Sequence, residues 1–111
     1  MQEPMQTIQQ FDVFCSLSEL KSKKFIVKWM ESLRDELMAV WQNGEIRIFS
    51  SICPHFGGEF KYDKRHNQFV CKWHGFCFDG KQGDCRYPAS KMKLRKYEYR
   101  LQSGSIEVLR P

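Results

Sequence analysis

Two short stretches, Cys53-Pro54-His55-Phe56-Gly57-Gly58 and Cys71-Lys72-Trp73-His74-Gly75, carry the strongest chemical signal in the sequence. They read C-x-H and C-x-x-H, and 15 residues separate His55 from Cys71. Each stretch offers one thiolate and one imidazole, and both groups bind transition metals. Glycines follow each pair, so the backbone can turn tightly and bring its N–H groups close to a bound group. The pattern therefore indicates a metal centre held by two loops.

Two kinds of metal site suit this donor set. Zinc is held by two cysteines and two histidines in many structural sites, but those sites usually draw the cysteines from one segment and the histidines from another. Here each segment is mixed. A mixed pair in each loop suits a dinuclear iron–sulfur cluster, in which one iron takes both cysteines and the other takes both histidines. The sequence favours the cluster, and a zinc-stapled binding module remains the alternative.

The rest of the chain predicts β-structure, because apolar residues alternate or form short runs rather than a sustained helical stripe. The dipeptide Asn43-Gly44 predicts a tight hairpin turn between strands at 36–41 and 46–49. Further strands are expected at 11–15, 24–30, 68–71, 94–101 and 106–109, although 31–38 would also tolerate a helical turn. Seven or eight short strands predict an all-β fold, either a small antiparallel sandwich or a barrel.

Length and composition set the broad class. A chain of 111 residues fits one domain, and 41% hydrophobic residues with 14% aromatics exclude disorder. The formal net charge of +5 favours acidic partners. No apolar run is long enough to cross a bilayer, and residues 1–10 lack the basic start and apolar centre of a signal peptide. Five cysteines without secretory context argue against a disulfide framework, so we expect a cytoplasmic protein.

The stretches CPHFGG and CKWHG resemble the two cluster-binding boxes of Rieske [2Fe–2S] proteins. The flanking stretches FDVFCSLSEL and HGFCFDGKQGDC look like the framing of small Rieske ferredoxins and of oxygenase Rieske domains, so the resemblance covers nearly the whole chain. It implies the Rieske fold over a single domain, 1–111: an antiparallel β-sandwich base that carries a smaller cluster-binding subdomain at about 50–90. By the same resemblance, one [2Fe–2S] cluster is bound by Cys53 and Cys71 on the inner iron and by His55 and His74 on the outer, solvent-facing iron.

Three positions depart from the respiratory branch of that family. In that branch each box holds a further cysteine, and the two form a disulfide; the matching positions here are Gly58 and Trp73. That branch also has a serine whose hydroxyl bonds a bridging sulfide, where this chain has Phe76. Loss of a donor to a cluster sulfur disfavours the reduced state, so we expect a potential near the low end of the Rieske range, about −150 mV. This indicates low-potential ferredoxin chemistry rather than quinol oxidation.

The remaining reactive side chains have plainer interpretations. Cys15, Cys77 and Cys85 are interpreted as small buried hydrophobic residues, with redox sensing or spare ligation as the alternative. His66 is expected to be a solvated turn residue. Pro88 resembles the proline of a third loop that covers the cluster in the Rieske family.

A run of basic residues lies between positions 86 and 100. It contains six basic residues against one acidic residue, and it is either a solvated strand face or a docking patch for an acidic partner. The basic residues are Arg86, Lys91, Lys93, Arg95, Lys96 and Arg100.

The resemblance implies a one-electron carrier, a Rieske-type ferredoxin that binds a reductase and a terminal oxygenase transiently and is itself a monomer. The chain is not expected to be an enzyme. An oxygenase iron needs two histidines and a carboxylate, and only His66 remains after the cluster takes two histidines. No G-x-G-x-x-G motif supports a reductase, and no motif supports nucleic-acid binding. The alternative function is a Rieske subunit, or an excised Rieske domain, of a larger oxidoreductase or oxygenase.

Overall fold

The computed structural model describes residues 9–52, 59–72, 75–88 and 90–111, and within them it confirms the all-β expectation. These residues form ten strands, one short α-helix and one 3₁₀ turn. The base is built from β1 (Phe11–Ser16), α1 (Leu17–Lys23), β2 (Phe25–Met30), η1 (Glu31–Leu33), β3 (Asp35–Gln42), β4 (Glu45–Ser50), β9 (Tyr99–Gln102) and β10 (Ser105–Leu109). Between β4 and β9 lie β5 (Phe60–Asp63), β6 (Gln68–Cys71), β7 (Cys77–Asp79) and β8 (Cys85–Tyr87).

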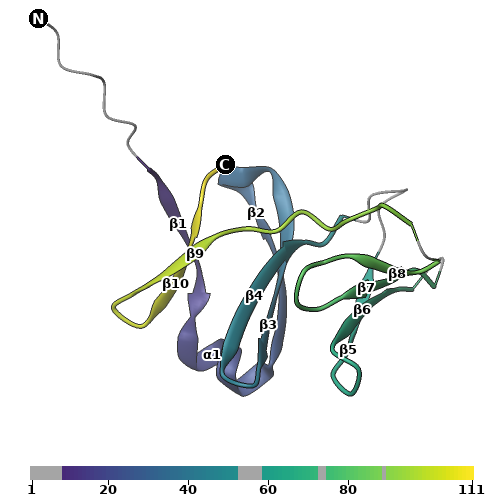
Figure 1. Ribbon diagram of the computed structural model, residues 1–111. Coiled ribbons are helices and arrows are strands. Elements are labelled where there is room, and N and C mark those ends of the chain that lie inside the picture. The colour runs from purple at the N-terminus through teal and green to yellow at the C-terminus, as the bar shows by residue number, and fades with distance from the viewer. Residues whose placement is uncertain (1–8, 53–58, 73–74, 89) are drawn as a thin grey trace, which may run out of the picture.

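The strands form three antiparallel sheets (Figure 1). Their orders are β1-β10-β9, β2-β3-β4 and β5-β6-β7-β8. The first two sheets form the base, and the four-stranded sheet stands beside them as a smaller unit. This arrangement is the predicted β-sandwich base with a smaller subdomain.

Strand β3 is buried on both of its faces, which places the β2-β3-β4 sheet in the middle. Successive side chains of a strand point to opposite faces of its sheet. Leu37 and Ala39 belong to the core shared with β1, α1 and β10, whereas Met38 and Val40 belong to the core shared with β5 to β8. The near-continuous apolar run of β3 is therefore explained by two cores rather than one.

Helix α1 was not predicted from the sequence. The Ser16 hydroxyl accepts a hydrogen bond from the Glu19 N–H at 3.1 Å, and Lys24 closes the helix in the left-handed region by donating to the Leu20 carbonyl. Leu20 is the one fully buried residue of the helix, so seven residues show no apolar stripe. The Ser-x-x-Glu spacing was the available signal. No helix in the described parts of the chain is long and apolar enough to span a membrane.

The predicted strand at 94–101 is wrong over its first half, since β9 begins only at Tyr99. Leu94 and Tyr97 are buried in an extended connection instead. The Tyr97 N–H donates to the Ile48 carbonyl at 2.9 Å, so this connection lines β4 rather than pairing with β10. The strand count also exceeds seven or eight, because β7 and β8 have three residues each and are too short to show alternation.

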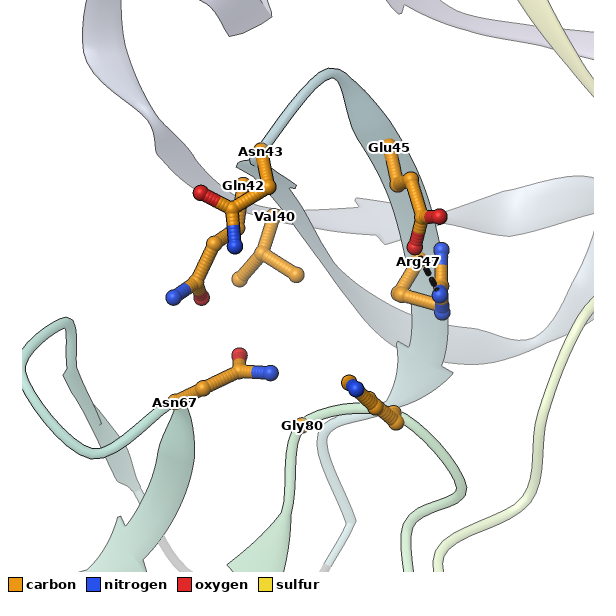
Figure 2. A pocket seen from close by; sticks show the side chains of 8 residues that line it. Val40, Gln42, Asn43, Glu45, Arg47, Asn67 and Gly80 are labelled. Atoms are coloured by element: carbon orange, nitrogen blue, oxygen red, sulfur yellow. Dashed lines mark hydrogen bonds and ion pairs between the residues drawn. The ribbon is translucent and has the colours of Figure 1, made fainter.

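The hairpin ends of two sheets meet at a narrow cleft of about 120 Å³ (Figure 2). Gln42 from the β3–β4 hairpin and Asn67 from the β5–β6 hairpin both bond to the Tyr62 hydroxyl. The Gly80 N–H donates to the Asn67 carbonyl at 2.9 Å. A Cβ at Gly80 would lie 2.3 Å from the Asn67 side-chain oxygen, so only glycine fits there. This polar clasp ties the small sheet to the middle sheet.

Candidate metal centre

Cys71 is the predicted ligand that lies within the described residues. It is the last residue of β6, and its side chain is fully buried in the second core together with Phe60, Phe69 and Phe78. The other predicted ligands lie outside the described residues: Cys53, His55 and His74. The site is therefore built from Cys71 and from the described residues that flank the two cluster-binding stretches.

The chain reverses direction directly after Cys71. The Cys71 N–H donates to the Phe76 carbonyl and the Gly75 N–H donates to the Cys71 carbonyl, both at 2.8 Å. Gly75 has a φ of +70°, which a residue without a side chain adopts at little cost. The glycine at the end of the CKWHG stretch thus makes the tight turn that the sequence predicted, and it brings the chain back into β7.

The residue that follows the first cluster-binding stretch and the start of the second stretch meet at one end of the small sheet. Glu59 directly follows the first stretch and Lys72 lies in the second. The Lys72 N–H donates to the Glu59 carbonyl at 2.9 Å, and the Lys72 ammonium lies 3.2 Å from the Glu59 carboxylate. Phe60 and Cys71 are register partners in β5 and β6. Glu59 and Lys72, 13 positions apart in sequence, are thereby held side by side.

A third segment leaves from the same end of this sheet. Tyr87, the last residue of β8, pairs with Cys77, the first residue of β7. Pro88 follows through a cis peptide bond, and the Cys85 thiol donates to the Pro88 carbonyl at 3.2 Å. The structure thus brings Pro88 to the end of the sheet where Cys71 lies.

The strand that leads into the first stretch is anchored by a buried carboxylate. Asp35, at the start of β3, accepts hydrogen bonds from the Ser50 hydroxyl at 2.9 Å and from the Tyr97 hydroxyl at 2.6 Å. Burial, reinforced by the hydrogen bond to Asp35, raises the pKa of Tyr97 to about 12, so the phenol remains a neutral donor. The base therefore fixes the position of Ser50, three residues before Cys53.

The next two residues are fixed as well. The Ser51 hydroxyl donates to the Glu36 carboxylate at 2.6 Å, and the Ser51 N–H donates to the Glu36 carbonyl at 2.7 Å. The Ile52 N–H donates to the Ser50 hydroxyl at 3.2 Å. Sequence reasoning missed this network, because nothing in the local pattern shows that serines at 50 and 51 face acids 15 residues earlier. Residues 50–52 are thus held by side-chain bonds up to the first cluster-binding stretch.

The described donor chemistry fits a [2Fe–2S] cluster. An isolated negative charge on a sulfur buried among aromatic rings is unfavourable, whereas the charge of a thiolate bound to a metal ion is compensated by the metal. The glycine turn after Cys71 and the backbone bond between Lys72 and Glu59 hold Cys71 close to the residue that follows the first stretch, as a centre with ligands from both stretches requires.

Among the described residues, the cysteines outside the two stretches belong to no cluster of three or more metal-binding side chains. Cys15 and Cys85 are buried, which confirms the interpretation as small buried residues. Cys77 is only half-buried, because it opens β7 beside the Gly75 turn, where its thiol donates to the Gly75 carbonyl at 3.5 Å. Burial raises the pKa of the Cys15 and Cys77 thiols, which keeps them protonated at neutral pH.

His66 is exposed, as expected for a solvated turn residue. Its ring Nδ1 lies 2.8 Å from the Asp63 carboxylate, and this hydrogen bond is the main cause that lowers the pKa of Asp63. Both residues lie at the hairpin between β5 and β6, at the opposite end of the small sheet from Cys71.

The basic run does not form one strand face. Arg100 lies on β9 and pairs with Glu107 at 2.7 Å, whereas Arg86 lies on β8 and Lys93 follows it. Arg86 and Lys93 are 3.4 Å from Asp79 and Asp84 respectively. The run is therefore divided between the base and the small sheet, and part of its charge is already paired.

Comparison with known proteins agrees with this architecture. The family model described as the Rieske [2Fe-2S] domain matches residues 10–98. No curated protein sequence gives a significant match.

Several solved structures share the fold. The plasma membrane Rieske protein PetC3 of the cyanobacterium Synechocystis PCC 6803 is 23% identical, with a TM-score of 0.71 over 92% of this chain and 98% of that one. The ferredoxin of carbazole 1,9a-dioxygenase from Nocardioides aromaticivorans IC177 is 18% identical, with a TM-score of 0.76 over 91% and 98%. A putative NADH-dependent nitrite reductase small subunit from Mycobacterium tuberculosis is 15% identical, with a TM-score of 0.69 over 95% and 98%.

Proposed function

The chain belongs to the family of Rieske [2Fe–2S] domains and binds a [2Fe–2S] cluster, and from this premise we propose that it is a Rieske-type ferredoxin. It carries one electron at a time from a reductase to a terminal oxygenase. The observation that supports this proposal is the contact of Lys72, beside Cys71, with Glu59, which directly follows the first cluster-binding stretch, in a chain whose fold matches an oxygenase ferredoxin along nearly its whole length. Domain 1–111 then acts as one electron-transfer unit.

Four side chains hold the cluster in this proposal. Cys53 and Cys71 bind the inner iron, and His55 and His74 bind the outer iron. The burial of Cys71 supports its place on the inner side. When bound, the cluster supplies a one-electron redox centre, and the imidazoles of His55 and His74 form the edge through which the electron leaves.

The proposed potential is low, near −150 mV. Phe76 stands where a serine would donate to a bridging sulfide, and its side chain packs against the second core. A phenyl ring at this position supplies no hydrogen bond to sulfur. The chain therefore suits donation to an oxygenase better than oxidation of a quinol.

The proposed role is transfer rather than catalysis. His66 is bonded to Asp63 at the hairpin end, away from Cys71, so it does not extend the site into a catalytic iron centre. Cys15, Cys77 and Cys85, the described cysteines outside both stretches, are free thiols, which suits the proposed cytoplasmic location. We assign the chain as a monomer that meets its partners transiently.

The second candidate is a permanent Rieske subunit of a larger oxidoreductase. The similarity to the nitrite reductase small subunit favours it, because that protein has the same fold over 98% of its length. Gel filtration after anaerobic purification at native expression levels separates the two. A free carrier elutes alone at the size of one chain, whereas a subunit elutes with its partner.

Reductive titration tests the carrier function itself. Under anaerobic conditions, dithionite should deliver one electron per chain, and reoxidation by ferricytochrome c should recover one electron per chain. Uptake of no electron, or of more than one, would contradict a single [2Fe–2S] carrier.

A further inference from the structure

A groove opens beside the entry to the first cluster-binding stretch. It has a volume of about 360 Å³. Three parts of the chain meet in it. The residues that carry the argument are Arg34 and Asp35 from the turn that opens β3, Ser50 and Ile52 from the end of β4, and Lys93 and Arg95 from the connection after β8.

The charge that this groove offers to a partner is positive. The Asp35 carboxylate is buried and accepts two hydroxyl groups, so it is not available to a partner's cations. Arg34 makes no ion pair with any described residue, and the Arg95 guanidinium lies over the Tyr97 ring at 5.7 Å rather than on a carboxylate. Lys93 is paired with Asp84 at 3.4 Å, but both side chains are more than half exposed. Such an exposed ion pair is weak, so Lys93 can also contact a partner's carboxylate.

The groove also contains an apolar contact next to the cluster. Ile52 is 51% exposed although it is a large aliphatic residue, and it directly precedes the proposed ligand Cys53. Neighbouring Cα atoms are about 3.8 Å apart, so a partner that contacts Ile52 lies beside the redox centre. An apolar contact surrounded by charges is the usual composition of a transient interface.

The opposite side of the same segment has a different charge. A second groove of about 320 Å³ is lined by Val27, Glu36, Ser51, Glu59, Phe60 and Lys72. Its two carboxylates outnumber its one ammonium group, and Lys72 is already paired with Glu59. Of these two grooves, only the one lined by Arg34, Lys93 and Arg95 offers net positive charge, which gives an approaching acidic surface a preferred orientation.

We propose that the groove formed by Arg34, Lys93, Arg95 and Ile52 is the docking site for an electron-transfer partner with an acidic surface. Carboxylates of the partner contact the three cations, and an apolar side chain of the partner covers Ile52. This inference rests on the proposed carrier function. It excludes Lys96 and Arg100 from docking, although they belong to the same basic run, because neither lines this groove.

The test uses the reduced holoprotein and an anionic oxidant, hexacyanoferrate(III), which takes one electron from the protein and becomes hexacyanoferrate(II). The variant Arg34→Glu/Arg95→Glu reverses two charges in the groove. The matched control Lys81→Glu/Lys96→Glu makes the same change in net charge at two exposed positions outside it. The second-order rate should fall about tenfold in the groove variant and less than about twofold in the control. The salt dependence should weaken only in the groove variant.

Two further measurements sharpen the result. Tris(phenanthroline)cobalt(III), a cationic oxidant, should react faster with the groove variant than with the wild type. A hexaglutamate peptide should slow oxidation of the wild type and of the control but not of the groove variant. The single variant Lys93→Glu should also be oxidised more slowly by hexacyanoferrate(III) than the wild type, by a smaller factor than the double variant.

Equal rate losses in the groove variant and the control, or no loss in either, would overturn the docking site. Iron content, sulfide content and the EPR signal are measured on every variant and should match the wild type. If the wild type itself takes up no electron from dithionite, the carrier function fails and not the docking site, so the two failures are distinguishable.

Discussion

The two hydrophobic cores on either side of β3 differ in composition and in the strands that enclose them. The base core is mainly aliphatic, and its strands have four to eight residues. The core under the small sheet is rich in aromatic rings, and strands β5 to β8 have only three or four residues each. Short strands make few ladder hydrogen bonds. We therefore expect the base to be stable by itself, and the small sheet to depend on its aromatic rings and on cluster binding.

Phe69 is the centre of the aromatic core. Its ring lies 5.5 Å from Phe49 and 6.5 Å from Phe60 in edge-on contacts, and 5.4 Å from Tyr62. Phe49 belongs to β4 of the middle sheet, so Phe69 joins the small sheet to the base. Aromatic pairs of this kind contribute about 0.5 to 1.5 kcal/mol each beyond their buried area.

The largest difference between the two regions is expected on loss of a cluster ligand. Cys71→Ser should abolish cluster binding, because the buried thiolate is replaced by a poor iron ligand. Hydrogen exchange should then accelerate in β6 and β7, while β3 and β10 keep their protection. Cys15→Ser, which changes a buried thiol in the base core, is the matched control and should keep a full iron complement. Iron loss in that control would show that the base also depends on the metal.

The second effect is expected in the cores themselves. Phe69→Ala should lower the free energy of unfolding by about 3 to 5 kcal/mol and also make the iron labile, since the cavity opens beside Cys71. Leu37→Ala in the base core should cost about 2 to 5 kcal/mol without releasing iron. Urea unfolding with parallel iron release into a chelator measures both quantities. Equal iron release from the two variants would mean that the cores are not independent.

The third effect concerns the Tyr97 hydroxyl group, which donates a hydrogen bond to the buried Asp35 carboxylate. Tyr97 has its pKa raised to about 12, above the ordinary value of 10, so its neutral form is favoured in the folded state. The resulting stability is fully present below pH 10 and is lost as the pH rises to 12. This loss should amount to about 2 to 3 kcal/mol. Unfolding measured from pH 9 to 12 should show the decline in the wild type, and Tyr97→Phe should lack this part of it. An unchanged decline in Tyr97→Phe would assign it to other groups.

A smaller effect is expected at the clasp on the far end of the small sheet. Gly80→Ala places a Cβ within 2.8 Å of the Asn67 carbonyl oxygen, so the two hairpins must separate. The expected cost is about 1 to 3 kcal/mol with little change in iron content. The neighbouring exposed Lys81→Ala is the control and should stay within about 0.5 kcal/mol of the wild type. Thermal unfolding measures the two variants, and equal stability would show that the clasp tolerates a side chain.

The sequence predicted those parts of the fold that local chemistry determines. The Asn43-Gly44 hairpin is confirmed, and both residues have positive φ angles of 52° and 74°. The architecture followed from the two metal-binding stretches through a family resemblance. The anchor at Asp35 was not predictable, because its two partners lie 15 and 62 residues away in sequence. Helix α1 was missed because its single buried leucine, Leu20, produces no helical periodicity of apolar residues. Tertiary contacts of this kind leave no local pattern.

The most direct test of the account is anaerobic analysis of iron and acid-labile sulfide combined with EPR of the dithionite-reduced protein. The account predicts two irons and two sulfides per chain and one unpaired electron per chain on reduction. In protein labelled with ¹⁵N-histidine, ENDOR spectroscopy should detect two coupled histidine nitrogens, from His55 and His74. Stoichiometric zinc without sulfide, or a reduced centre without histidine coupling, would contradict the account.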